Sequence, residues 1–155
     1  MKKNVAAALV LALGVGIIGA GAGLAAGSAD DMINARQAEM KVNVKAIKTL
    51  LAMVKGGTPF DAAAVQAAAK SISDAQAEGV AKDVWNASYQ TGTAVKSNAK
   101  PEVWSDAAGF AAAWKNLDTA VAAVGASKDE ASLKAAFPKL GAACKSCHET
   151  YRAAD

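Results

Sequence analysis

The fold is decided by one stretch near the end of the chain, ASLKAAFPKLGAACKSCHETYR, residues 131–152. Its apolar side chains and both cysteines recur at alternating spacings of four and three residues. The members of this stripe are Leu133, Phe137, Leu140, Cys144, Cys147 and Tyr151. Because such spacing collects side chains on one face of an α-helix, the stretch predicts a helix that buries this stripe against other helices.

Two local signals bear on how this last helix runs. Ser127 and Glu130 are three residues apart, which predicts a capping box in which each side chain satisfies an unpaired backbone amide of the other. Pro138 lies inside the stripe, has no amide hydrogen and crowds the preceding turn. We therefore expect the helix to be kinked or restarted at Pro138.

Three further segments upstream show the same helical periodicity. With the last segment, they predict helices over residues 31–55, 61–79, 102–125 and 127–151, and a long crossover over residues 80–100. The composition, 53% hydrophobic but only 5% aromatic, indicates a core of small side chains that suits closely packed helices. The sequence therefore predicts an all-α, antiparallel four-helix bundle with space for a cofactor between facing helices.

The first residues are unlike the rest of the chain. Lys2 and Lys3 precede an apolar run, which is followed by small residues up to Ala29. This pattern predicts a secretory signal peptide over residues 1–29, removed between Ala22 and Ala29, and a domain over residues 30–155 with no membrane segment. The alternative is a membrane anchor, because residues 5–26 are about as long as a bilayer is thick.

Charge excludes one class of function. All 14 acidic residues lie at or after Asp30, whereas two of the 17 basic residues lie in the leader. The remaining domain is close to neutral and has no basic stripe with interleaved aromatic residues. We therefore expect no binding to nucleic acid.

The sequence Cys144-Lys145-Ser146-Cys147-His148 carries the chemistry. On a helix, residues three apart share a face, so two thiols can add to the two vinyl groups on one edge of a haem. The adjoining histidine can then bind the iron through an imidazole nitrogen. The motif predicts one covalently attached haem c.

Three other interpretations of the cysteine pair stay open. A helical disulfide at this spacing closes a very small loop and stabilises little. A thioredoxin-like redox pair needs a preceding strand and helix pattern, which the sequence lacks. A closed zinc site needs four ligands, and His148 is the single histidine. The rival class is thus a haem-free helical module with a disulfide or a metal at Cys144 and Cys147.

The single histidine also limits the sixth iron position. That position is open, or it is held by methionine, lysine or an external ligand. Of the methionines outside the leader, Met40 lies on the bundle-facing stripe of the first helix. Arg36 and Arg152, the only arginines, lie one turn from Met40 and His148, where guanidinium groups suit the two propionates of a haem.

Four segments together resemble the class II c-type cytochromes typified by cytochrome c-prime. The matching segments are residues 35–41, 57–61, 100–104 and 144–152, and together they span nearly all of the chain after the leader. The position of the haem motif at the C-terminus is the most specific part of the resemblance. The crossover over residues 80–100 departs from the proline-containing loop common in that family.

The resemblance implies a periplasmic four-helix bundle, often a homodimer, with one covalent haem. On the proximal side of the iron it implies thioethers at Cys144 and Cys147, ligation by His148, and Arg152 beside it. Near the propionates it implies Arg36 and Gln37, and facing the sixth position it implies Met40.

The resemblance also implies a choice between two functions. In some members of the family the residue at the Met40 position only covers an empty site, and the iron binds nitric oxide or carbon monoxide. In others a first-helix methionine ligates the iron and the protein passes electrons to small redox proteins. We expect Met40 to lie over an open iron face in a non-enzymatic cytochrome, with ligation by Met40 as the alternative.

Overall fold

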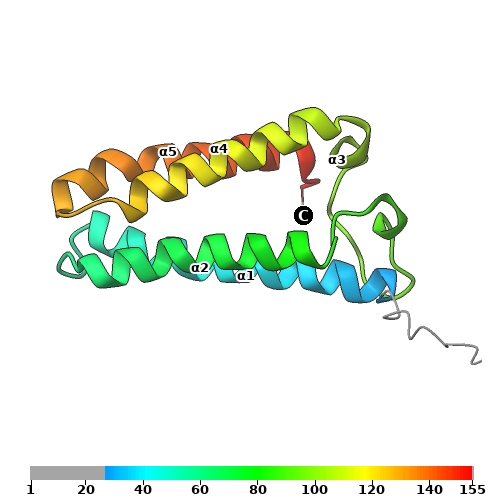
Figure 1. Cartoon of the computed structure of the whole chain (residues 1–155), viewed down its shortest axis with the longest axis horizontal. Coiled ribbons are helices and arrows are strands. Elements are labelled where there is room, and N and C mark those ends of the chain that lie inside the picture. The colour runs from blue at the N-terminus through cyan, green and yellow to red at the C-terminus, as the bar shows by residue number, and fades with distance from the viewer. Residues whose placement is uncertain (1–26, 155) are drawn as a thin grey trace, which may run out of the picture.

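The computed structural model describes residues 27–154, and four long helices of this part form an antiparallel bundle (Figure 1). The elements are α1 (Ala29–Val54), α2 (Ala62–Ala81), η1 (Ala87–Tyr89), α3 (Glu102–Ser105), α4 (Ala107–Gly125) and α5 (Glu130–Tyr151). In Figure 1, α1 and α2 make one layer and α4 and α5 the other. The predicted all-α four-helix bundle is confirmed.

The leader prediction falls almost wholly on residues 1–26, outside the described residues. Within residues 27–154, none of the helices combines the length and apolar character needed to cross a bilayer.

The hydrophobic core joins both layers. Its most deeply buried side chains are Leu50, Val65, Ile72, Val124, Leu133 and Leu140. Each such side chain contributes about 1.5–3 kcal/mol by leaving water. Because α1 packs against α2 and α5, and α4 packs against α5 and α2, the helices α2 and α5 are diagonal partners in the bundle.

Two helix starts differ from the predicted ones, because other side chains than expected cap these helices. Ser28 caps α1 in a capping box with Asp31, so α1 begins two residues earlier than expected. The predicted capping box of Ser127 with Glu130 is wrong, because the pair is Asp129 with Ser132. The Asp129 carboxylate accepts from the Ser132 amide at 2.7 Å, and the Ser132 hydroxyl accepts from the Asp129 amide at 3.1 Å. Ser127 is instead buried at the end of α4.

The predicted third helix is divided into α3 and α4. The break is at Asp106, whose backbone (φ −115°, ψ 56°) leaves the helical region. Its side chain accepts from the Gly109 amide at 3.0 Å and so caps α4.

Pro138 does not restart the last helix. α5 runs without interruption from Glu130 to Tyr151. Pro138 itself is exposed, whereas Leu140 is fully buried in the core. Packing of the stripe therefore holds the helix together where the proline removes one backbone hydrogen bond.

We expect Pro138→Ala to raise the free energy of unfolding by up to about 3 kcal/mol, because it restores a helical hydrogen bond at an exposed position. Urea denaturation followed by circular dichroism measures the change. Pro59→Ala, at an exposed proline before α2, is the control and should give no gain. A loss of stability in Pro138→Ala would show that α5 needs the proline.

Candidate haem-binding site

The last two turns of α5 carry Cys144, Cys147 and Tyr151 on the side that faces the bundle. Both cysteines are free and half-buried, and Cys144 packs against the hydrophobic core. Tyr151 is buried, with its ring centroid 5.1 Å from that of Phe110 on α4. The inward face of α5 thus changes along its length from hydrocarbon to thiols and then to an aromatic ring.

A single carboxylate fixes this end of α5 to α4. The Tyr151 hydroxyl donates to Asp106 Oδ2 at 2.8 Å, and the other oxygen of Asp106 caps α4 through Gly109. The hydrogen bond to Asp106, with burial adding to it, raises the pKa of Tyr151 to about 12. The phenol therefore stays a donor at all physiological pH values.

The crossover also holds the last turn of α5. The Lys100 amide donates to the Tyr151 carbonyl at 2.9 Å, and the Ala153 amide donates to the Asn98 carbonyl at 2.8 Å. Lys100 Nζ donates to the Glu149 carbonyl at 2.8 Å. These contacts fix the backbone that directly follows the motif.

The titration behaviour of the motif suits the chemistry predicted for it. Burial raises the pKa of the Cys144 thiol, and burial together with Cys144 raises the pKa of Cys147. Both groups are therefore neutral thiols rather than reactive thiolates. Partial burial, with Arg152 second, lowers the pKa of His148, which favours the neutral imidazole that ligates metals.

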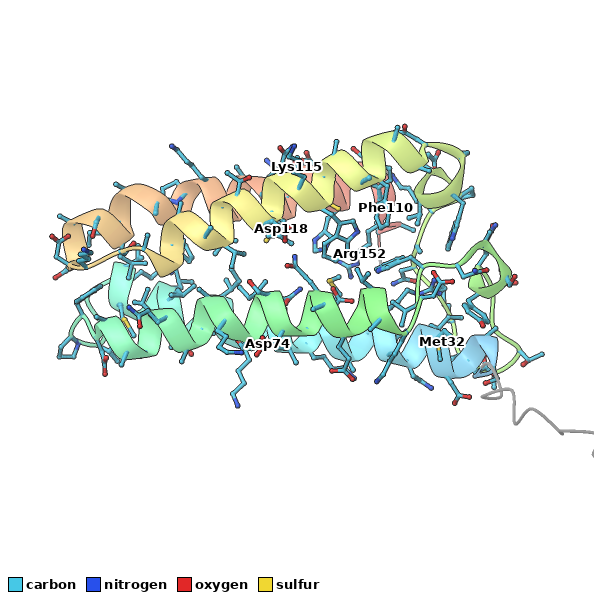
Figure 2. All side chains as sticks on the ribbon, in the orientation of Figure 1. Met32, Asp74, Phe110, Lys115, Asp118 and Arg152 are labelled. Carbon is cyan, nitrogen blue, oxygen red and sulfur yellow. The ribbon has the colours of Figure 1, made fainter. Side chains whose placement is uncertain are left out.

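His148 itself is more exposed than the cysteines. It lines an open hollow with Lys100, Lys145, Glu149 and Arg152. The predicted neighbourhood of His148 and Arg152 is thus present, and Figure 2 shows Arg152 and Phe110 at the same end of the bundle.

A cavity of about 440 Å³ lies between the layers at this end. Four aromatic side chains supply much of its wall, namely Trp85, Trp104, Phe110 and Trp114. The cysteines are not in its wall, but Phe110 links it to Tyr151 on the face of α5 that carries them. Its size falls in the range of cofactor and ligand pockets, about 300–1,000 Å³.

Arg36 and Gln37, predicted near the propionates, occupy different environments. Arg36 is only 4% exposed and stacks over the rings of Trp85 and Trp104, at 5.1 and 5.8 Å. Its guanidinium donates to the carbonyls of Val84 and Tyr89. Gln37 is exposed and donates to the Lys96 carbonyl at 3.0 Å. Arg36 therefore borders the cavity, whereas Gln37 ties down the crossover.

Met40 is half-buried, and its sulfur accepts from Asn43 Nδ2 at 3.9 Å. The first-helix residue in the cavity wall is instead Glu39, opposite Gln76 of α2. The sequence analysis missed both, because a polar residue on a helix is ordinarily solvated. The available signal was that Glu39 lies one turn after Arg36, beside the apolar stripe.

The residues present fit a haem. The cavity wall is largely apolar and aromatic, as a porphyrin ring requires, and two neutral thiols lie on the neighbouring face of α5. Both carboxyl oxygens of Glu39 and the amide nitrogen of Gln76 are buried without a hydrogen-bond partner. Within residues 27–154, no group of three or more His, Cys, Asp or Glu side chains is placed to hold a metal ion.

Comparison with known proteins supplies the family. The family model described as "Cytochrome C'" matches residues 31–152. The chain belongs to the cytochrome c-prime family. It is 37% identical over 139 residues to cytochrome c' of Rhodopseudomonas palustris, covering 89% of this chain and 92% of that one.

Further similar proteins include a cytochrome c-556 and a solved structure of a cytochrome c'. Cytochrome c-556 of Agrobacterium fabrum is 37% identical over 153 residues, covering 97% of this chain and 94% of that one. The crystal structure of cytochrome c' from Thermochromatium tepidum superposes with a TM-score of 0.74 at 28% identity, covering 84% of this chain and all of that one. Membership of the family confirms the predicted cofactor, one covalently attached haem c.

We expect Tyr151→Phe to lower the free energy of unfolding by about 1–3 kcal/mol at pH 7, because it leaves the Asp106 carboxylate without this donor. The pKa of Tyr151 is higher in the folded state than in the unfolded state, so this stabilisation is complete below about pH 10 and is lost as the pH rises through about 12. Denaturant unfolding at pH 7 and pH 11 measures both effects. Tyr89→Phe, which keeps its backbone contact with Arg36, is the control. Equal stability of the wild type and Tyr151→Phe at pH 7 would show that the hydrogen bond contributes nothing.

Proposed function

We propose that this class II cytochrome is exported to the periplasm, holds its haem through Cys144 and Cys147, ligates iron with His148, and leaves the opposite iron face open to nitric oxide or carbon monoxide. The observation that carries the proposal is that the two cysteines of the Cys-x-x-Cys-His motif lie half-buried on the face of α5 whose Tyr151 contacts Phe110 of the aromatic cavity wall. The function is gas binding linked to electron transport, without enzymatic turnover.

Cys144, Cys147 and His148 have the chemical groups that attachment of a haem requires. Cys144 and Cys147 would hold the haem, each through a thioether formed by addition of its S–H across one vinyl group, the hydrogen going to the other vinyl carbon. His148 offers the lone pair of a neutral ring nitrogen, and Arg152 stays beside it. The bound haem supplies an iron that exchanges one electron and binds diatomic gases.

Two observations support the open sixth position. The cavity wall is mainly aromatic and apolar, which suits small neutral ligands. The Met40 sulfur already accepts a hydrogen bond from Asn43. Solved structures similar to this chain include a nitric oxide complex of a cytochrome c-prime variant from Alcaligenes xylosoxidans, with a TM-score of 0.72 and 27% identity over 83% of this chain and 98% of that one.

The second candidate is a low-spin electron carrier in which Met40 is the sixth ligand. It is favoured by the position of Met40, which is half-buried on α1 one turn after Arg36. A thioether is a common axial ligand in electron-transfer haems.

Export is part of the proposal. Ser28 caps α1, so removal of the leader before Ser28 keeps the capping box. In an oxidising compartment, covalent attachment also prevents loss of the cofactor and uses both thiols.

The first prediction concerns attachment. We expect the purified protein to keep its haem on a denaturing gel stained for haem peroxidase activity, because thioethers survive denaturation. Replacing Cys144 and Cys147 together by alanine should abolish the stain, whereas Ser146→Ala, inside the same motif, should keep it. An unstained wild-type band would support the haem-free module.

The second prediction concerns the sixth position. We expect the ferrous protein to change its absorption spectrum with carbon monoxide. Met40→Ala should bind the gas about tenfold more tightly, which corresponds to about 1.4 kcal/mol of relieved crowding. Met32→Ala is the control. A methionine-to-iron charge-transfer band in the ferric wild type that is lost in Met40→Ala, with no response to carbon monoxide in the wild type, would establish the electron carrier instead.

The third prediction is a homodimer. Val44 of α1 is 52% exposed, and pairing of this helix with a second copy would cover it. Sedimentation equilibrium at micromolar concentration should give twice the mass of the processed chain. A monomer mass across that range would reject the dimer.

A further inference from the structure

Two polar side chains are buried in the wall of the cavity with no partner. Glu39 is 6% exposed and Gln76 is 8% exposed, so both are more than nine-tenths buried. Both carboxyl oxygens of Glu39 and the amide nitrogen of Gln76 have no hydrogen-bond partner. A buried polar atom without a partner destabilises a protein, so these two side chains are candidates to bind a ligand in the cavity.

The backbone of α2 makes room for one of them. A Cβ at Gly79 would lie 2.7 Å from Glu39 Oε2, so a side chain there would require the Glu39 carboxyl to move. Gly79 is one turn after Gln76, so the Glu39 carboxyl lies on the same stretch of α2 as the Gln76 amide. A glycine inside a helix is destabilising relative to alanine, and here it leaves space for a carboxyl that has no hydrogen-bond partner in the protein.

Arg36 does not neutralise Glu39, although it precedes it by one turn on α1. The Arg36 guanidinium donates to the carbonyls of Val84 and Tyr89 and lies over Trp85 and Trp104. It nevertheless adds a buried positive charge next to this part of the cavity. The polar groups of the cavity are therefore concentrated on its α1 and α2 side, whereas Phe110 and Trp114 of α4 are apolar.

The polar side of the cavity lies on α1 and α2, and the haem motif lies on α5. α2 is the diagonal partner of α5, which carries both cysteines. A haem has its vinyl groups along one edge and its two propionates along the opposite edge. A haem bonded to α5 along its vinyl edge would have its propionate edge on the side away from α5, and Gln76 and Glu39 of the cavity wall are then candidates to hold it.

We propose that Gln76 and Glu39 form a hydrogen-bonding subsite for a haem propionate. The inference rests on the proposed covalent haem. Gln76 Nε2 offers two N–H donors to a carboxylate oxygen. Glu39 borders the same space, and in its protonated form its carboxyl O–H would be a second donor.

The test uses the haem-loaded protein and a matched pair of variants. Gln76→Leu removes the donor at nearly constant volume, and Gln66→Leu makes the same change at an exposed position of α2. Resonance Raman spectra report the propionate bending bands directly. We expect these bands to shift in Gln76→Leu and to stay unchanged in Gln66→Leu, and we expect the thermal midpoint to fall in Gln76→Leu alone.

An unchanged propionate band in Gln76→Leu overturns the proposal, because it means that Gln76 does not donate a hydrogen bond to the propionate. If Gln76→Leu fails to load haem, Glu39→Gln provides the second route, since it keeps a donor of the same size and should shift the same bands by a smaller amount. A pyridine haemochrome spectrum of each sample measures covalent haem independently. Absence of that spectrum in the wild type rejects the proposed function itself, whereas its presence with unshifted bands in both variants rejects only the subsite.

Discussion

The structure depends on the continuous inward stripe of α5, which serves two purposes along one helix. Its first half, Leu133 and Leu140, is fully buried in the core. Its second half presents Cys144, Cys147 and Tyr151, where the layers enclose an aromatic cavity. Because one rigid helix carries both halves, the packing of the core fixes the position of the two thiols.

The crossover completes the cavity wall and is itself held by hydrogen bonds with Arg36 and Asp30 of α1. Arg36 of α1 binds two crossover carbonyls and stacks on Trp85 and Trp104, while Asp30 accepts hydrogen bonds from the amides of Ala94 and Val95. A buried guanidinium is costly unless its N–H groups are bonded. The long segment between α2 and α4 is therefore a structural part of the cavity wall.

Helix periodicity and the motif were enough to predict the bundle, the covalent haem and its C-terminal position, because each depends on local spacing. The helix ends were harder, because several residues near each end can cap. Asp129, and not Ser127, is the N-cap of α5. The expected third helix is divided at Asp106, which caps α4. At Pro138 the helix continues against the local preference of proline, because the packing of Leu133 and Leu140 in the core stabilises it. Glu39 and Gln76 were missed, because their burial follows from the packing of α1 against α2, and the position of Glu39 one turn after Arg36 is only a weak signal of it.

The central claim is that one haem is bonded to the last two turns of α5. The most direct measurement is mass spectrometry of the peptide that contains Cys144 to His148, after treatment of the denatured protein with a thiol-alkylating reagent. The account predicts this peptide with the added mass of one haem and no alkylated cysteine. Two alkylated cysteines, or a peptide with an internal disulfide and no added haem mass, would contradict it.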